Sequence, residues 1–215
     1  MHLQRGHTFD KGAGVSRIII FGDSNSYGEG LDDPLTQNYG YHLSKLSNRI
    51  VVNNAIPSCS NTSILLEILK FNFQPDDLVL IGWTYVGREL LMFDEHKCKH
   101  LGAWIDSTDV LNRAWLEHVN QDYDLMIKSF MHMSHANHYL TQKNIKYIQF
   151  WFEGNYEIFK LKEQTVWMNN VSMDFDLLTE IGHIDSTHCK HPGPKSHEIA
   201  AEYVYNKFKH MFEFT

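Results

Sequence analysis

Short apolar runs that end abruptly in polar turns recur along the chain. The clearest is Ile18 to Phe21, which leads straight into Gly22, Asp23 and Ser24. An apolar run of this length, bounded by turn residues, is typical of a strand that is covered on both faces, as in a parallel sheet. Similar runs predict three further strands, at residues 49–52, 78–81 and 145–152.

Segments with apolar residues at helical spacing separate these strands. Helices are predicted at residues 39–46, 62–71, 122–142 and 195–212. Residues 85–120 are less regular, and we interpret them as helical pieces with an irregular insertion. The alternation of strands and helices favours an α/β fold: a three-layer α/β/α sandwich of flavodoxin-like type, with a mainly parallel sheet of about five strands.

The length and composition fit one globular domain. The chain has 215 residues, of which 43% are hydrophobic and 21% are charged. A chain of this size buries enough surface to be stable without disulfides. We expect a flexible leader at residues 1–16 and a single domain at residues 17–215. The 3 cysteines are odd in number and lack Cys-x-x-Cys spacing, which favours a reduced protein.

Charge and hydropathy disfavour several classes of partner. The net charge of −7, with scattered Lys and Arg, disfavours binding to nucleic acid or to an anionic membrane. No apolar run approaches the roughly 18 residues that cross a bilayer. The first residues of the chain lack the apolar stretch of a signal peptide. These features predict a cytoplasmic protein and leave its oligomeric state open.

Ser24 is the first candidate for chemistry. It follows a predicted buried strand, and in open α/β sheets ligands bind at the carboxyl ends of the strands. A serine hydroxyl becomes nucleophilic when a neighbouring base takes its proton. The segment before the last helix offers a base and an acid, in Asp185, His188 and His191. The simpler interpretation is that Ser24 caps a helix in an ordinary strand-to-helix turn.

Two segments at opposite ends of the chain resemble the SGNH hydrolases, also called GDSL-type esterases and lipases. Gly22-Asp23-Ser24-Asn25 is similar to the first block of that family, whose serine is the nucleophile. His191-Pro192-Gly193-Pro194-Lys195-Ser196-His197 is similar to the last block, in which an Asp and a His precede a Pro-rich turn. The resemblance implies a serine esterase that forms an acyl-enzyme and needs neither a metal nor an organic cofactor.

The middle blocks depart from the family pattern. Where the family has a Gly whose N–H enters the oxyanion hole, this chain offers Ser58, Cys59 or Ser60. A backbone donor there depends on the local conformation rather than on the side chain. Thr84 stands where the third block has an Asn, and Asn61 is a candidate to replace the missing amide. Loss of one oxyanion donor typically lowers the rate about a hundredfold to a thousandfold.

The last block leaves the identity of the base open. Asp185 and His188 have the Asp-x-x-His spacing of the family, but the Pro-Gly-Pro and second His that follow fit His191. We favour His191 oriented by Asp185, with His188 as the alternative base. By the resemblance, Ser24 attacks an ester carbonyl, and N–H groups of Ser24 and the Ser58 region hold the oxyanion. The family suggests O-acetyl groups on a carbohydrate as the substrate class.

Other interpretations compete with this one. The histidines near residue 190, together with Cys189, are zinc-type ligands, but their spacing matches no strong motif. His183 is more simply a surface residue. Arg88 and Glu89 either contact substrate at the rim of the cleft or form an exposed ion pair, which we prefer. The main alternative function is a catalytically weak or inactive binding or structural protein with the same fold, because Thr84 departs from the family pattern.

Overall fold

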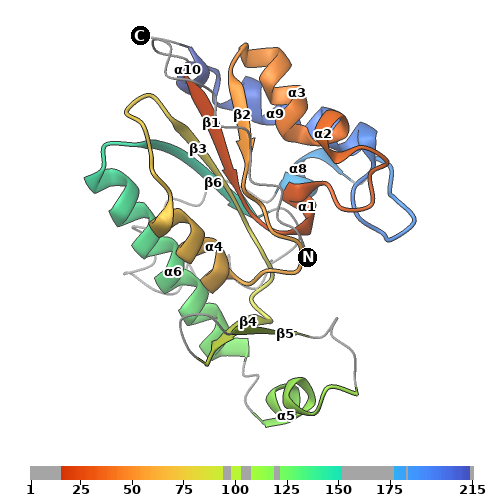
Figure 1. Ribbon diagram of the computed structural model, residues 1–215. Helices are drawn as coiled ribbons and strands as arrows, with labels where there is room; N and C mark the ends of the chain where they lie inside the picture. The colour runs from red at the N-terminus through yellow and green to blue at the C-terminus, as the bar shows by residue number, and fades with distance from the viewer. Residues whose placement is uncertain are drawn as a thin grey trace.

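The computed structural model describes residues 16–93, 98–102, 108–118, 122–151, 177–182 and 184–213. Its centre is a parallel sheet with the strand order β2-β1-β3-β6 (Figure 1). These strands are β1 (Arg17–Phe21), β2 (Ile50–Asn53), β3 (Leu78–Trp83) and β6 (Lys146–Trp151). Each coincides with a predicted strand, and within the described residues the sheet has 4 strands rather than about five.

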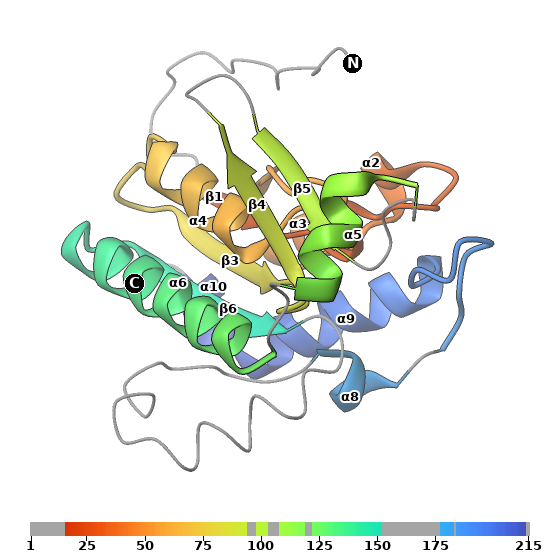
Figure 2. The ribbon, with the colours of Figure 1, turned by 90° about the horizontal axis from the view of Figure 1, so that it is seen from below.

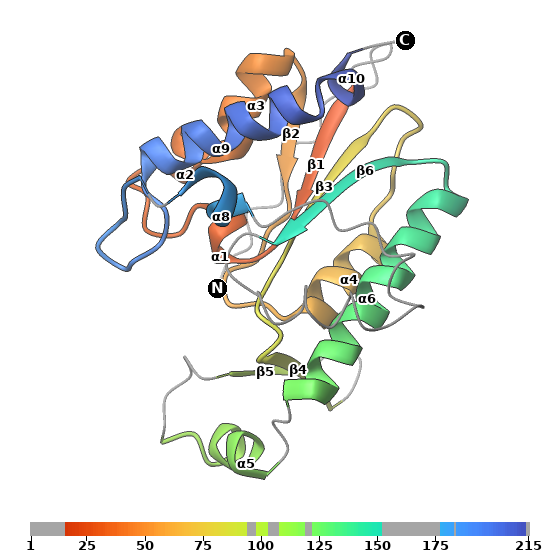
Figure 3. The ribbon, with the colours of Figure 1, turned by 180° about the vertical axis from the view of Figure 1, so that it is seen from behind.

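Alternate side chains of the strands supply two separate cores. Ile19 and Phe21 face one side, where they pack with α4 (Asn61–Lys70) and α6 (Asp122–Gln142). Ile18 and Ile20 face the other side, where they pack with α3 (Tyr39–Ser47) and α9 (Pro194–Lys207). Figures 1 and 3 show these helical layers on opposite faces of the sheet. Because β1 and β3 are covered on both faces, their sequences are continuously apolar, and the predicted three-layer sandwich is confirmed.

The segment after β3 differs from its prediction. Instead of helical pieces, residues 88–102 contain an antiparallel hairpin of β4 (Arg88–Met92) and β5 (Cys98–Gly102), followed by α5 (Val110–His118) (Figure 2). The prediction of helix was wrong for the hairpin. The apolar run at residues 90–93 is too short to distinguish a strand from a helical piece, and in β4 only Leu90 is buried, so no alternation of buried and exposed residues marks the strand.

The carboxyl-terminal helix is also divided. The predicted helix at residues 195–212 is interrupted at Phe208, which separates α9 from α10 (Lys209–Phe212). Two further short helices are α2 (Pro34–Gln37) and α8 (Leu177–Ile181). None of the helices in the described part of the chain is both long and apolar enough to span a bilayer.

Most of the predicted leader, residues 1–15, lies outside the described residues. Its last residue, Ser16, is buried, and its hydroxyl donates to the carbonyl of Asp76 at 3.1 Å. Ser16 therefore packs with the domain instead of belonging to a loose leader.

Candidate active site

Ser24 is the first residue of α1 (Ser24–Tyr27), directly beyond the carboxyl end of β1. Asp23 is the N-cap, and its carboxylate accepts from the N–H of Asn25 at 3.0 Å. The interpretation of Ser24 as the helix cap is therefore wrong, because Asp23 has that role. Among the described residues, the Ser24 hydroxyl has no hydrogen-bond partner, although the residue is only 3% exposed.

Close packing holds this turn. A Cβ atom at Gly22 would lie 2.5 Å from Cβ of Ser26 and 2.9 Å from the carbonyl oxygen of Gly82. Gly22 is required there because any side chain would separate α1 from the end of β3. The end of β2 and the loop after it add two bonds: the Asn53 amide donates to the Ser26 carbonyl at 2.9 Å, and Ile56 N–H donates to the Gly22 carbonyl at 2.9 Å.

The Asp23 carboxylate is the electrostatic centre of the turn. It is 1% exposed, and its Oδ2 accepts from the hydroxyl of Thr84 at 2.7 Å. The guanidinium of Arg88 lies 3.0 Å from the same oxygen. Arg88 thus forms a largely buried ion pair with the residue before Ser24, and the preferred interpretation of an exposed pair was wrong for it. Glu89 points elsewhere, toward Lys128 at 3.5 Å.

Neither predicted replacement for the third-block Asn has a spare side-chain donor for an oxyanion. The Thr84 hydroxyl donates to Asp23, so its only proton is used. The Asn61 amide donates to the Thr84 carbonyl at 3.0 Å and to the Ser129 hydroxyl at 3.0 Å. Its oxygen accepts from the Thr84 N–H at 2.9 Å. Asn61 and Thr84 therefore fasten α4 to the end of β3.

The residues Ser58, Cys59 and Ser60, which stand where the family has its oxyanion Gly, also have structural roles. Ser60 caps α4, accepting from the Ser63 N–H at 3.3 Å. Ser58 has a left-handed backbone, with φ of 60°. The Cys59 thiol donates to the Gly22 carbonyl at 3.4 Å. Burial, followed by the nearby charge of Asp23, raises the pKa of Cys59, which keeps the thiol neutral and unsuited to nucleophilic attack. The Ser60 hydroxyl is fully buried and lies 3.2 Å from the Ser63 hydroxyl, which disfavours a side-chain oxyanion role for Ser60.

Asp185 is held by the start of α9. Its Oδ2 accepts from the N–H of Lys195 at 3.0 Å. Its Oδ1 accepts from the N–H of Ser196 at 2.8 Å and from the Ser196 hydroxyl at 2.7 Å. Burial acts to raise the pKa of Asp185, but the hydrogen bonds from Ser196 and Lys195 outweigh it and lower the pKa below its ordinary value. The carboxylate is thus a cap for α9, and no hydrogen bond or ion pair joins Asp185 to His191 among the described residues.

His191 has other neighbours. Its Nδ1 lies 3.2 Å from the thiol of Cys189, and its Nε2 lies 3.7 Å from Oε2 of Glu29. The loop that carries it is closed at its base, where the N–H of Gly193 donates to the Asp185 carbonyl at 3.1 Å. His188 lies at the exposed tip of this loop. Of the two candidate bases, His191 has a carboxylate neighbour, and His188 has none among the described residues.

His197 is a core residue. It is fully buried, accepts from the N–H of Tyr39 at 3.2 Å and stacks on the Tyr39 ring. Burial, followed by repulsion from His42, lowers the pKa of His197 to about 4, so the imidazole is neutral near pH 7. Across the described segments, no group of three or more His, Cys, Asp or Glu side chains is arranged to hold a metal ion. His183, another of the zinc-type candidates, lies outside the described residues.

The comparisons with known proteins point to one kind of fold. No family model matches the chain, and no curated protein matches it by sequence. Solved structures do match. A lipolytic protein of the G-D-S-L family from Desulfitobacterium hafniense is 12% identical, with a TM-score of 0.52 over 88% of this chain and 98% of that chain.

Two carbohydrate-directed proteins are similar as well. An acetyl xylan esterase from the rumen bacterium Butyrivibrio proteoclasticus is 17% identical, with a TM-score of 0.53 over 95% of this chain and 67% of that chain. A carbohydrate esterase, described as having divergent catalytic and non-catalytic binding functions, is 13% identical, with a TM-score of 0.58 over 95% and 69%. The chain has the fold of the GDSL-type hydrolases. The resemblance drawn from the two terminal blocks is thereby confirmed at the level of the fold.

The GDSL-type fold brings the two blocks to one edge of the sheet without joining them. The Glu29 side chain, shortly after α1, meets His191. Figure 1 shows the loop before α9 projecting beside α1 and α2. No hydrogen bond between Ser24 and His191 exists among the described residues. The predicted nucleophile and base therefore share a region of the surface, and their contact remains a prediction.

Sequence reasoning missed three features of the candidate site. Glu29 has no motif of its own and lies between two glycines, so only the fold reveals that it meets His191. Cys189 is a candidate metal ligand by residue type, and in the structure its thiol contacts the His191 imidazole. Asp23 is the partner of Arg88, and the sequence does not predict this pair because it does not predict the hairpin that carries Arg88.

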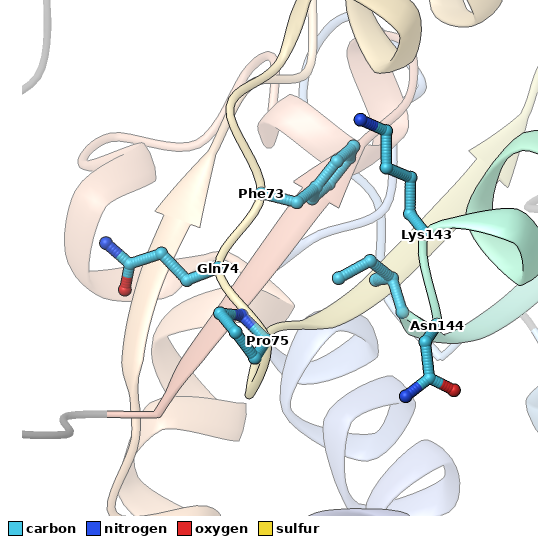
Figure 4. Close-up of a pocket in the computed structure, with 6 residues that line it drawn as sticks. Phe73, Gln74, Pro75, Lys143 and Asn144 are labelled. Carbon is cyan, nitrogen blue, oxygen red and sulfur yellow. The ribbon is translucent and has the colours of Figure 1, made fainter.

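A separate hollow lies away from this site. Figure 4 shows Phe73, Gln74, Pro75, Lys143 and Asn144 around a cavity of about 320 Å³. These residues precede β3 and β6, so the hollow is at the amino ends of the strands. Ligands of open α/β sheets bind at the opposite, carboxyl edge, where Ser24 lies. The cavity therefore does not compete with Ser24 as the candidate active site.

Proposed function

We propose that the protein is a serine esterase, with Ser24 as the nucleophile and His191 as the general base. The observation that carries this proposal is the position of Ser24 at the start of a helix, directly after a buried strand. Asp23 caps this helix, so the Ser24 hydroxyl is not needed as the cap. The GDSL-type fold supports the same role. The substrate class is an ester with a small acyl group, and O-acetyl groups on a carbohydrate are the first to test, since acetyl xylan esterase has a similar fold.

The reaction divides into two acyl transfers. Ser24 Oγ bonds to the ester carbonyl carbon while His191 takes the hydroxyl proton, and the alcohol then leaves with that proton. Water attacks the acyl-enzyme, again losing a proton to His191, and releases the acid and free Ser24. His191 must come within about 3 Å of Ser24 Oγ for these transfers, and such hydrogen bonds often tighten only when substrate binds.

Backbone groups are the proposed oxyanion donors. The N–H of Ser24 belongs to the first turn of α1, where amides lack partners within the helix. The left-handed Ser58 lies in the loop that bonds to Gly22. The side chains of Asn61 and Thr84 have other partners, so main-chain donors are the favoured choice. Asp185 fixes the loop that carries His191, so its proposed effect on the base is indirect, through the position of that loop.

A non-catalytic binding protein is the second candidate. It is favoured by the cap role of Asp185, since the carboxylate that would complete a triad is held by Lys195 and Ser196. Such a protein would keep the fold and bind an ester or a carbohydrate without cleaving it.

Hydrolysis of p-nitrophenyl acetate separates the two candidates. We expect Ser24→Ala to lower kcat at least about a thousandfold and His191→Ala to lower it about a hundredfold to ten-thousandfold. His188→Ala is the matched control in the same loop and should stay within about twofold of wild type, because the exposed His188 contacts nothing in the proposed chemistry. A fluorophosphonate should label wild type and not Ser24→Ala. If wild type is neither active nor labelled, the binding protein is the correct assignment.

A further inference from the structure

A buried carboxylate next to a serine nucleophile presents an electrostatic problem. Asp23 precedes Ser24 directly and is 1% exposed. During acyl transfer the carbonyl oxygen of the substrate becomes an oxyanion close to Ser24. Two like charges in a site that excludes water repel each other strongly, because little solvent screens them. An uncompensated Asp23 would therefore oppose the step that Ser24 has to carry out.

Arg88 supplies the compensation. It is the first residue of β4, and its guanidinium lies 3.0 Å from Oδ2 of Asp23. The Arg88 side chain is 13% exposed and that of Asp23 2% exposed, so water screens the pair weakly. In the part of the chain that the structure describes, Arg88 is the only cation within ion-pair distance of Asp23.

The surroundings fix both partners. Thr84 donates to the same oxygen of Asp23 at 2.7 Å, and Asn25 N–H donates to the other oxygen at 3.0 Å. Thr84 is in turn held through its own N–H and carbonyl by Asn61. Next to Arg88, Glu89 anchors the start of β4 by accepting from the Thr62 hydroxyl at 3.1 Å. The hairpin thus delivers Arg88 to a carboxylate whose orientation is already set.

We infer that Arg88 is a positioning residue that neutralises Asp23 and so permits an oxyanion to form beside Ser24. This inference rests on the proposed esterase function. It also accounts for Thr84 at the place of the third-block Asn, since a threonine hydroxyl orients the carboxylate that Arg88 neutralises. Arg88 acts through Asp23 and does not itself touch the reacting atoms.

A double-mutant cycle on Asp23 and Arg88 tests the inference with p-nitrophenyl acetate. We expect Arg88→Gln to lower kcat by about tenfold to a hundredfold with KM nearly unchanged, less than the loss of a direct oxyanion donor. Arg88→Lys retains the charge and should recover most of that loss. In the Asp23→Asn background no carboxylate needs compensation, so adding Arg88→Gln should lower kcat less than about threefold.

Several results would overturn the inference. If Arg88→Gln lowers kcat equally in both backgrounds, Arg88 acts on the substrate directly or through the fold. If Arg88→Lys is as slow as Arg88→Gln, charge is not what matters. Circular dichroism and thermal unfolding of each variant identify any that fail to fold, and Arg88→Lys then decides. If the fluorophosphonate labels Ser24 of the wild type but the effects of Asp23→Asn and Arg88→Gln on kcat are additive, only the role of Arg88 is wrong. If the wild type is neither labelled nor active, the esterase proposal is wrong as well.

Discussion

The turn at Ser24 and the loop at His191 use their acidic residues differently. In the turn, Asp23 caps a short helix with one carboxylate oxygen and forms a buried ion pair with the other. In the loop, Asp185 gives both oxygens to the first turn of α9. The first carboxylate therefore sets a local charge beside the nucleophile, and the second sets the shape of the loop that holds the base.

The difference shows how a site with family-like motifs can be organised unevenly. The Ser24 turn is buried and packed against β3, so its geometry is fixed before any substrate arrives. The His191 loop has an exposed tip, and it is fixed by the bond from the Thr187 N–H to the His191 carbonyl at 2.8 Å as well as where it joins α9. We expect the nucleophile to be preorganised and the base to adjust during catalysis.

The largest effect is expected from filling the space at Gly22. Gly22→Ala would place a methyl group against Ser26 and the Gly82 carbonyl, neither of which can move without shifting α1 or β3. Overpacking typically costs about 1–3 kcal/mol, and because backbone must shift here we expect about 4 kcal/mol of lost unfolding free energy in urea titrations. Gly87→Ala is the matched control, since a Cβ there meets open space. A Gly22→Ala protein as stable as this control would show that the turn is loosely packed.

The next effect concerns pH and His197. Its pKa is lowered to about 4 from an ordinary value of 6.5, so the unfolded chain binds a proton on this imidazole that the folded chain does not. The contribution of neutral His197 to the free energy of unfolding is fully present above pH 6.5. It is lost as the pH falls from 6.5 to 4 and changes no further below pH 4, and the total loss is about 3 kcal/mol.

His197→Asn isolates this contribution, because its amide oxygen still accepts from the Tyr39 N–H but gains no charge. Urea titrations at pH 7.5 and pH 4.5 should show a smaller loss of stability in the variant than in wild type. Equal losses would mean that a different group, such as His132, whose pKa is also lowered by burial, carries the acid sensitivity.

The smallest effect tests the cap role of Asp185. Asp185→Ala removes three hydrogen bonds from the start of α9 and should lower the unfolding free energy by about 2 kcal/mol. Ser186→Ala, at an exposed neighbouring position, should change it by less than about 0.5 kcal/mol. For activity, Asp185→Asn should lower kcat less than about a hundredfold. A loss of kcat near ten-thousandfold is typical of a triad acid. It would contradict the cap role and show that Asp185, like Asp23, acts on the catalytic groups.

Most of the central fold could be predicted from the sequence. The apolar runs at residues 18–21 and 78–81 predict β1 and β3 because both faces of these strands are covered, and α6 has the buried residues Phe130, Met133 and Leu140 at helical spacing. The hairpin at Arg88 was missed because the short apolar run in β4 does not distinguish a strand from a helix, and β5 has a single large apolar residue, Leu101. The ion pair of Asp23 was therefore missed as well, because its partner Arg88 lies on that hairpin.

The site itself was only partly predictable. Ser24 follows from the strand-turn-helix pattern, which is local in sequence. The partners of Asp185 are ten and eleven residues away, and a three-residue ambiguity in spacing between His188 and His191 could not be settled by pattern alone. The Asn61–Thr84 pairing joins a helix to a strand end, and such non-local bonds depend on packing that the sequence does not display.

The bond between the Tyr39 N–H and His197 has a consequence for synthesis of the protein on the ribosome. It joins residues 158 positions apart, and it holds α9 against the segment that follows the nucleophile turn. The strands β1, β2 and β3 and helix α3 are synthesised before α9, but the cover over Ile18 and Ile20 is complete only when α9 packs beside α3. Because such distant contacts slow folding, we expect the face of the sheet that α9 covers to be completed only after α9 has been synthesised. The nucleophile turn, whose partners lie before residue 89, can form earlier.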